Sequence, residues 1–286
     1  MSIQSLDHLV EQVKQVPRLP DTAMRLVSVL GDPGSSVQDI VETIRYDQTV
    51  TAEILRLCNS AYFGLARRVN SLDEAIRLLG TAKVLQLAMS AQVQPVLNKP
   101  QEGYGLAPGS LWEHSVAVAL GCRDLARRVG AGDLGLSFTL GLLHDVGKVV
   151  LNEYVAAEYV EIVRRVSDEH MSFLEAEQSV LGFTHTEAGA RLAEVWSLPE
   201  VITKCIRYHH DPDEMETPDA LVDCVHLANT IGMLMGVGGG AVDGLAYRAS
   251  PAALERQGLG QRDLETIGAD IVAELRSVRQ LFAASK

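Results

Sequence analysis

The stretch Gly141–Leu151, GLLHDVGKVVL, is almost wholly apolar apart from one His-Asp pair and one lysine. Its spacing predicts a buried helix whose one polar stripe consists of Ser137, Gly141, His144, Asp145 and Lys148. Burying an aspartate and a lysine costs free energy unless they are paired or bound to something. A metal ion would satisfy the carboxylate, and Lys148 lies one turn away. The stretch therefore predicts a buried metal site on a helical scaffold.

Helical spacing extends through nearly all of the chain. Apolar residues recur at intervals of three and four, and two segments, Ser36 to Asp39 and Ser71 to Glu74, have the form of a capping box. The sequence has no alternating Val/Thr/Tyr segments and no Asn-Gly hairpin turns. We expect an all-α fold in which an N-terminal helical lobe packs on a helical bundle that carries the His-Asp pair.

Two segments interrupt this pattern. Residues 98–109 (NKPQEGYGLAPG) are rich in Pro, Gly and polar residues, and the part of the chain that follows them holds seven of the eight histidines. Residues 236–244 are rich in glycine and precede a last helical segment. We therefore expect an N-terminal lobe over residues 1–105, a metal-site lobe over 106–235 and a C-terminal helical extension over 236–286.

Composition limits the classes of function. The net charge of −12, from 25 basic and 37 acidic residues, argues against non-specific nucleic-acid binding. The four cysteines form no CxxC pair and fall in apolar helical patterns, which favours buried thiols in a reducing compartment. The N-terminus has early charges and no apolar signal segment, and the longest uncharged run is glycine-rich, so we expect a cytoplasmic protein without a membrane span.

Several histidines share a face with apolar residues. His114 lies three residues after Leu111 and four before Val118, and His185 falls in the first turn of a helix that Thr184-His-Thr-Glu187 would cap. His209 and His210 end the helix that begins at Pro199. Two adjacent histidines are about 100° apart on a helix, so they can flank one cavity or bind two ions.

A single histidine on an apolar face is more often a structural core residue, but five with a buried aspartate favour a metal site. The donor types suit Zn, Fe or Mn better than Mg or Ca, and a carboxylate between imidazoles can bridge two ions. We set aside His8 as a surface residue, His170 as a loop residue, and His226, which shares a helix face with Asp223. Asn229 is expected to point with the apolar side of that helix.

These residues together resemble a known family. LLHDVGK looks like the signature of the HD metal-dependent phosphohydrolase superfamily. Other stretches resemble HDOD domains, the HD-related output domains of bacterial signalling proteins. These stretches are VPRLPDTAMRLVSVL, IRYDQTVTAEILRLCNSAYFG, VNSLDEAIRLLG and, later in the chain, GFTHTEAGARLAEVWSLPEVI and the His pair. The resemblance covers about residues 15–235. It implies an HD-type helical bundle and a regulatory role.

The resemblance also implies site residues. His114 matches the first histidine ligand of the family. His144 and Asp145 match the HD pair, in which Asp145 would bridge the ions. His185, His209 and His210 match the last three histidine ligands. Lys148 matches a lysine thought to contact substrate phosphate. Asn229 stands where the superfamily has its final aspartate, so it is a weaker ligand without charge. Ser110 replaces a glutamate expected for a third metal, and the GYP motif after the His pair is absent.

Two functions remain open. The first is a non-enzymatic signalling module that binds a protein partner or a nucleotide and holds one or two metal ions, with Fe or Mn expected and Zn as an alternative. The second is a metal-dependent phosphohydrolase acting on a nucleotide or cyclic dinucleotide, in which metal-bound hydroxide attacks, Asp145 bridges the ions and Lys148 stabilises charge. Arg67 and Arg68 form a small basic patch, either a solvated turn or a partner contact.

Overall fold

A computed structural model describes residues 18–65, 67–238 and 248–283, and their regular structure is helical, so the predicted all-α fold is confirmed. The only β-type pairing in these ranges is an isolated bridge between Gln101 and Leu106. The α-helices are α2 (Asp21–Gly31), α3 (Val37–Arg45), α4 (Gln48–Cys58), α5 (Leu72–Leu79), α6 (Thr81–Leu97), α7 (Ser110–Val129), α8 (Leu134–Leu143), α9 (Gly147–Asp168), α10 (Phe173–Leu181), α11 (His185–Val195), α12 (Glu200–Tyr208), α13 (Ala220–Leu234), α14 (Pro251–Gln257) and α15 (Gln261–Ala283). Two 3-10 turns, η1 (Glu102–Tyr104) and η2 (Pro212–Glu214), complete the set.

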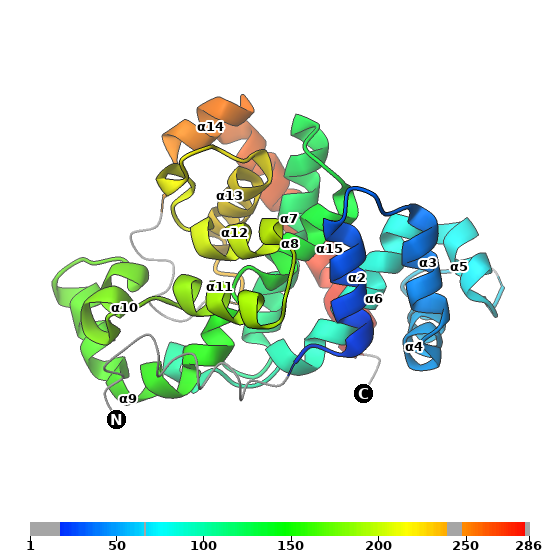
Figure 1. Ribbon diagram of the computed structural model, residues 1–286, viewed down its shortest axis with the longest axis horizontal. Helices are drawn as coiled ribbons and strands as arrows, with labels where there is room; N and C mark the ends of the chain where they lie inside the picture. Colours follow the sequence, from blue (N-terminus) through cyan, green and yellow to red (C-terminus); the bar gives the residue numbers. More distant parts are fainter. Residues whose placement is uncertain (1–17, 66, 239–247, 284–286) are drawn as a thin grey trace.

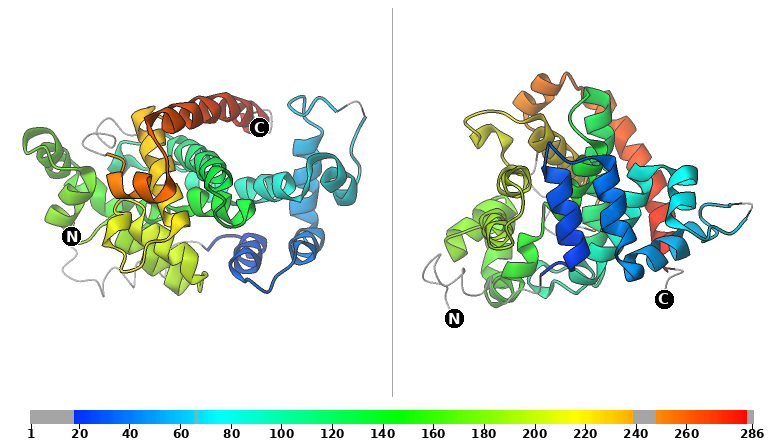
Figure 2. Two further views of the ribbon diagram at one scale, coloured as in Figure 1. Left: turned by 90° about the horizontal axis from the view of Figure 1, so that it is seen from above. Right: turned by 45° about the vertical axis from the view of Figure 1, so that its right-hand side comes forward.

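Helix α7 lies at the centre of the molecule, packed against α8, α13 and α15 (Figure 1). Helices α3, α4 and α5 lie at one end of the long axis and α9 and α10 at the other. The two further views show α15 running alongside this centre (Figure 2). One continuous cluster of buried apolar side chains runs from Leu19 to Phe282, so the N-terminal helices share a core with the bundle.

The helix starts follow the sequence signals. Ser36 and Asp39 form a complete capping box, and so do Thr184 and Glu187 in front of His185. At α5, Ser71 accepts from the backbone N–H of Glu74, but the Glu74 carboxylate accepts from the N–H of Asn70 instead of Ser71. The box predicted there is therefore only half formed.

The expectation of one helix through Gly141–Leu151 is wrong. Helix α8 ends at Leu143, residues 144–146 form a turn, and α9 begins at Gly147. Within the turn, the N–H of Val146 donates to Leu143 O (3.1 Å) and the N–H of Lys148 donates to Asp145 O (3.0 Å). Just after the turn, α9 approaches α11 so closely that position 147 needs glycine, because a Cβ there would lie 1.8 Å from His185 O. His144 and Asp145 therefore stand at a corner between two helices.

Among the described residues, one stretch, Leu134–Asn152, has the length and composition of a membrane span. It is 83% buried within the protein and contains the corner at residues 144–146. Its apolar character is therefore accounted for by its place in the core.

Residues 98–109, expected as a boundary segment, are folded against α9. Tyr104 in η1 is 2% exposed, and the Asn152 side-chain carbonyl accepts a hydrogen bond from the N–H of Gly103 at 3.0 Å. A Cβ on Gly103 would lie 2.1 Å from Asn152 O, so only glycine allows this contact. The segment between α6 and α7 thereby reaches the interior near the His-Asp corner.

An ion-pair cluster fastens α15 to the bundle. The Glu274 carboxylate lies 2.8 Å from both Lys83 Nζ and Arg123 Nη2, and Arg123 is buried. Burial would raise the pKa of Glu274, but Arg123 and Lys83 outweigh it and lower this pKa from 4.5 to about 2. A carboxyl group whose pKa is lower in the folded state than in the unfolded state stabilises the fold at pH values above its unfolded-state pKa.

We therefore predict that Glu274 contributes stability that is full above pH 4.5 and is lost as the pH falls towards 2. Glu274→Gln should lower the free energy of unfolding by about 2 kcal/mol at neutral pH, after allowance for solvent screening, and flatten its decline in acid. Urea unfolding between pH 3 and 7 measures both effects. Glu255→Gln, at an exposed site on α14, is the control, and an unchanged acid limb in Glu274→Gln would contradict the prediction.

Candidate metal centre

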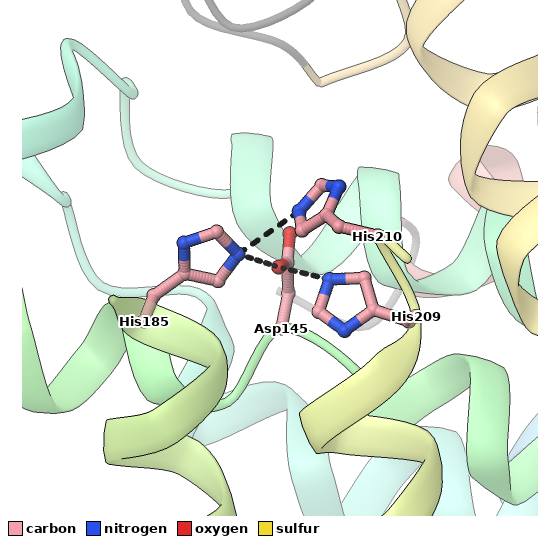
Figure 3. A group of neighbouring side chains, drawn as sticks. All are labelled: Asp145, His185, His209 and His210. Carbon is pink, nitrogen blue, oxygen red and sulfur yellow. Dashed lines mark hydrogen bonds and ion pairs between the residues drawn. The ribbon is translucent and has the colours of Figure 1, made fainter. Parts of the chain in front are cut away.

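Six titratable side chains predicted from the sequence converge on the corner after α8. Asp145 lies at the centre of the group, with His185, His209 and His210 around it (Figure 3). His114 and His144 form a second group with the same carboxylate. Within each group the potential ligand atoms lie within 4.8 Å of one another. The structure thus brings together residues from α7, the corner, the start of α11 and the end of α12.

We call the first group the His185 half. His185 Nε2 and His209 Nε2 lie 3.4 and 3.5 Å from Asp145 Oδ1. His210 Nε2 lies 3.0 Å from His185 Nε2. His210 is partly exposed, whereas the other three residues are buried. The half therefore opens towards solvent only on the side of His210.

We call the second group, with Asn229, the His114 half. His144 Nε2 and His114 Nε2 lie 3.5 and 3.7 Å from the other carboxylate oxygen, Asp145 Oδ2. Asn229 Oδ1 lies 2.9 Å from His114 Nε2, and Asn229 is buried, as its register on α13 predicted. Asp145 is thus shared, with one oxygen facing each half.

The opposite ring nitrogen of each buried imidazole is held by an acceptor. Carbonyl oxygens only accept, so for His144 and His209 a hydrogen bond from Nδ1 to a carbonyl places the proton there and leaves the Nε2 lone pair facing the centre. The acceptors are Val237 O for His114 (3.0 Å), Gly141 O for His144 (2.7 Å), Ile206 O for His209 (2.8 Å) and the Glu177 carboxylate for His185 (2.7 Å). This arrangement is typical of metal-binding histidines.

Four of the inner atoms have no aligned hydrogen-bond partner among the described residues. Both oxygens of Asp145, together with His144 Nε2 and His209 Nε2, are buried and accept no well-aligned hydrogen bond, although Lys148 Nζ forms an ion pair with Oδ2 at 2.9 Å. Buried polar atoms are nearly always satisfied, so such a convergence favours a bound partner. His185 Nε2 and His210 Nε2 lie 3.0 Å apart, and all the candidate ligand atoms of this half lie within 4.8 Å of one another, so they could bind the same ion. A divalent metal ion fits both halves.

The electrostatics of Asp145, His144 and His210 agree with ligand chemistry. Burial alone would raise the pKa of Asp145, but Lys148 and His144 outweigh it and hold that pKa well below its usual value. Burial lowers the pKa of His144 and of His210 well below the usual range, so both rings are neutral. At His185, burial is outweighed by Glu177, which raises the pKa of the ring. An ionised carboxylate and neutral imidazoles are the forms that bind metals.

Sequence reasoning missed Glu177. Its side chain is fully buried on α10 and accepts from both the Nδ1 and the backbone N–H of His185, at 2.7 and 3.0 Å. The signal was present, because Glu177 stands four residues after Phe173 and three before Val180, on the apolar face of its helix. The same register test that selected the histidines would have found it among the carboxylates.

The expectation that His226 and Asp223 lie away from the buried side is wrong, since both are buried. Arg256 of α14 pairs with Asp223 at 2.6 Å, and His226 Nε2 accepts from the N–H of Ser250. His226 Nδ1 donates to His209 O at 2.9 Å, so His226 supports the His pair without joining the centre. Helix α14 covers this face, and its distance in sequence hid the contact.

The remaining predicted residues lie outside the centre. His170 is exposed between α9 and α10, as expected, and His8 lies outside the described residues. Arg67 and Arg68 are exposed, and Arg67 pairs with Glu74 at 3.0 Å. All four cysteines are buried and free, as predicted.

Comparison with known proteins shows the family of the chain. A family model described as HDOD domain matches residues 16–212. The chain belongs to the HDOD family. An HDOD domain protein of unknown function from Geobacter sulfurreducens, solved by crystallography, has 27% sequence identity and a TM-score of 0.69, with 98% of each chain covered.

Two other proteins are similar to this chain. A crystal structure from Shewanella amazonensis, provisionally described as a phosphohydrolase, is 25% identical with a TM-score of 0.62 and covers 92% of this chain and 97% of its own. An uncharacterised protein of Treponema pallidum is 28% identical over 227 residues, which are 77% of this chain and 43% of that protein. The chain spans less than half the length of the curated relatives it matches.

Proposed function

We propose that this HDOD protein is a signal-transduction module whose centre binds one or two divalent transition metal ions, with Fe or Mn expected and Zn as the alternative. The observation that carries the proposal is the Asp145 carboxylate, 1% exposed, whose oxygens face imidazole nitrogens on both sides without an aligned hydrogen bond. Buried charges persist where they are paired or coordinate metals. Its partner would be another signalling protein or a nucleotide.

Two features favour a regulatory centre over a catalytic one. Asn229 brings no charge to the His114 half, and the ligand atoms are buried except on the side of His210. A hydrolase needs room for substrate beside its ions. The ions of a regulatory centre would instead fix the relative positions of the corner, α11 and the end of α12, and a ligand that changes their occupancy would change that packing.

The second candidate is a metal-dependent phosphohydrolase, favoured by Lys148. Its ammonium lies 2.9 Å from Asp145 Oδ2, where it can stabilise charge beside the centre. His210 is the partly exposed ligand, so a phosphate would approach from its side. A bound ion would supply Lewis-acid catalysis. The provisional description of the Shewanella relative points in the same direction.

Two experiments distinguish the two functions. The first is metal analysis of protein purified without chelator, and the second is a screen for turnover of cyclic dinucleotides, nucleotides and a generic phosphodiester. At least about one equivalent of Fe or Mn with no turnover supports the regulatory module. Turnover that Asp145→Ala abolishes supports the hydrolase. A metal-free protein that takes up no Fe, Mn or Zn on addition overturns both.

Asn229→Asp tests the His114 half. The added carboxylate should strengthen binding of the weaker ion by about tenfold or more, because it brings a negative charge within reach of His114 Nε2. Competition of the metal-loaded protein with a chromophoric chelator measures this affinity. Asn70→Asp, at an exposed site, is the matched control. Equal affinities in wild type and Asn229→Asp would remove Asn229 from the centre.

A further inference from the structure

The four buried imidazoles of the centre are not held alike. The Nδ1 atoms of His114, His144 and His209 donate to neutral backbone carbonyls. His185 alone among them donates to a carboxylate, Glu177 Oε2, which also accepts from the His185 backbone N–H. A carboxylate behind an imidazole makes the ring a stronger metal ligand and fixes its orientation.

Glu177 is itself held in place by a buried partner. Its other oxygen, Oε1, accepts a hydrogen bond of 2.7 Å from the Tyr104 hydroxyl, which comes from η1 in the segment between α6 and α7. Tyr104 packs against Phe173, with ring centroids 5.5 Å apart. Both oxygens of the carboxylate are thus engaged, and the chain Tyr104–Glu177–His185 leads from that segment to the centre.

The Glu177 carboxylate accepts three hydrogen bonds, from the Tyr104 hydroxyl and from the Nδ1 and backbone N–H of His185. In the part of the chain that the structure describes, its one ion pair is with His185. Burying a full charge beside an imidazole is costly unless positive charge lies close. An ion at His185 Nε2 would provide this charge through the ring. In the His114 half, as far as the described residues show, the Nδ1 atoms of His114 and His144 donate to carbonyls and not to a carboxylate.

We propose that Glu177 is a positioning residue for His185, held by Tyr104, and that it makes the His185 half the tighter of two unequal metal sites. The inference rests on the metal centre of the proposed function and adds the order in which two metal ions bind to its two halves. The first ion enters between Asp145, His185, His209 and His210, where two carboxylates act. A second ion, in the His114 half, binds more weakly with Asp145 as its one anionic ligand.

The proposal is tested by titrating metal-free protein with Mn²⁺. Calorimetry measures the heat of each binding step, and electron paramagnetic resonance measures the Mn²⁺ that stays free. Glu177→Gln keeps the side-chain shape and should weaken the tight step by about 10- to 100-fold, while the weak step stays within about twofold. Tyr104→Phe should weaken the tight step less, because the carboxylate remains. Glu175→Gln, exposed on the same helix, keeps its capping function and is the matched control.

The outcomes are distinguishable. Wild-type protein that binds no Mn²⁺ overturns the proposed function and this inference together. Wild-type binding with an unchanged tight step in Glu177→Gln overturns the inference and leaves the metal centre standing. Equal weakening of both steps indicates a merely structural role and also overturns it. Loss confined to the tight step, with Asn229→Asp strengthening only the weak step, supports it.

Discussion

Asp145→Asn is expected to reduce metal affinity at both halves of the centre by at least about 100-fold. One oxygen of this carboxylate faces His185 and His209, and the other faces His144 and His114. An amide keeps the shape of the side chain but brings no charge to either ion. Metal content after purification without chelator, and Mn²⁺ titration of the metal-free protein, measure the loss.

The same substitution should also destabilise the metal-free protein, by about 2–4 kcal/mol, because it removes the carboxylate from beside a buried lysine. Lys148 Nζ lies 2.9 Å from Asp145 Oδ2, and the lysine is 2% exposed. Asp145→Asn combined with Lys148→Met should recover most of the stability in urea without recovering metal binding.

Asp133→Asn, at the N-cap of α8, is the control, since asparagine caps helices as well as aspartate does. Full metal loading of Asp145→Asn would show that the carboxylate is not the shared ligand. A double variant as unstable as the single one would show that Lys148 is not the source of the lost stability.

Gly147→Ala should have the second large effect. A Cβ at this position would lie 1.8 Å from His185 O and 2.7 Å from the backbone N of Gly189, and neither backbone atom can rotate away. Helix α9 must therefore move away from α11, which costs about 3 kcal/mol or more. The movement would also separate Asp145 from His185, so the tight ion should be lost.

Urea unfolding and Mn²⁺ titration of Gly147→Ala measure these two effects separately. Gly260→Ala is the control, because an added Cβ there meets only Asp263 Oδ2 at 3.9 Å. Its stability should stay within about 0.5 kcal/mol of wild type. Wild-type stability and metal affinity in Gly147→Ala would mean that α9 and α11 tolerate a wider separation than the structure shows.

The helical class and the convergence of the histidines could be predicted because both depend on local periodicity. His114 and Asn229 share faces with apolar neighbours of their own helices, and the structure places them 2.9 Å apart. Register along one helix is visible in a short window of sequence. The roles of these residues as metal ligands remain predictions.

The features that were mistaken or missed depend on contacts between distant segments. The corner at residues 144–146 leads into α9 at the point where Gly147 lies against the His185 carbonyl of α11, a contact between distant segments. Asp223 is buried because Arg256 reaches it from α14. The spacing of apolar residues within one helix does not predict a contact with a residue from a distant helix. Glu177 is different, because its register was readable and only the choice of residue type excluded it.

The support that α14 and α15 give to the bundle bears on where the chain can be cut. The family match ends at residue 212, yet Arg256 neutralises Asp223, Ser250 engages His226 behind His209, and Glu274 neutralises Arg123 on α7. A fragment trimmed to the matched residues would leave out α13 with Asn229 and would remove Glu274 from the buried Arg123, which would keep Asp124 as its acidic partner. The smallest piece able to fold on its own with the centre intact therefore extends through α15, well past the boundary that family membership alone would draw.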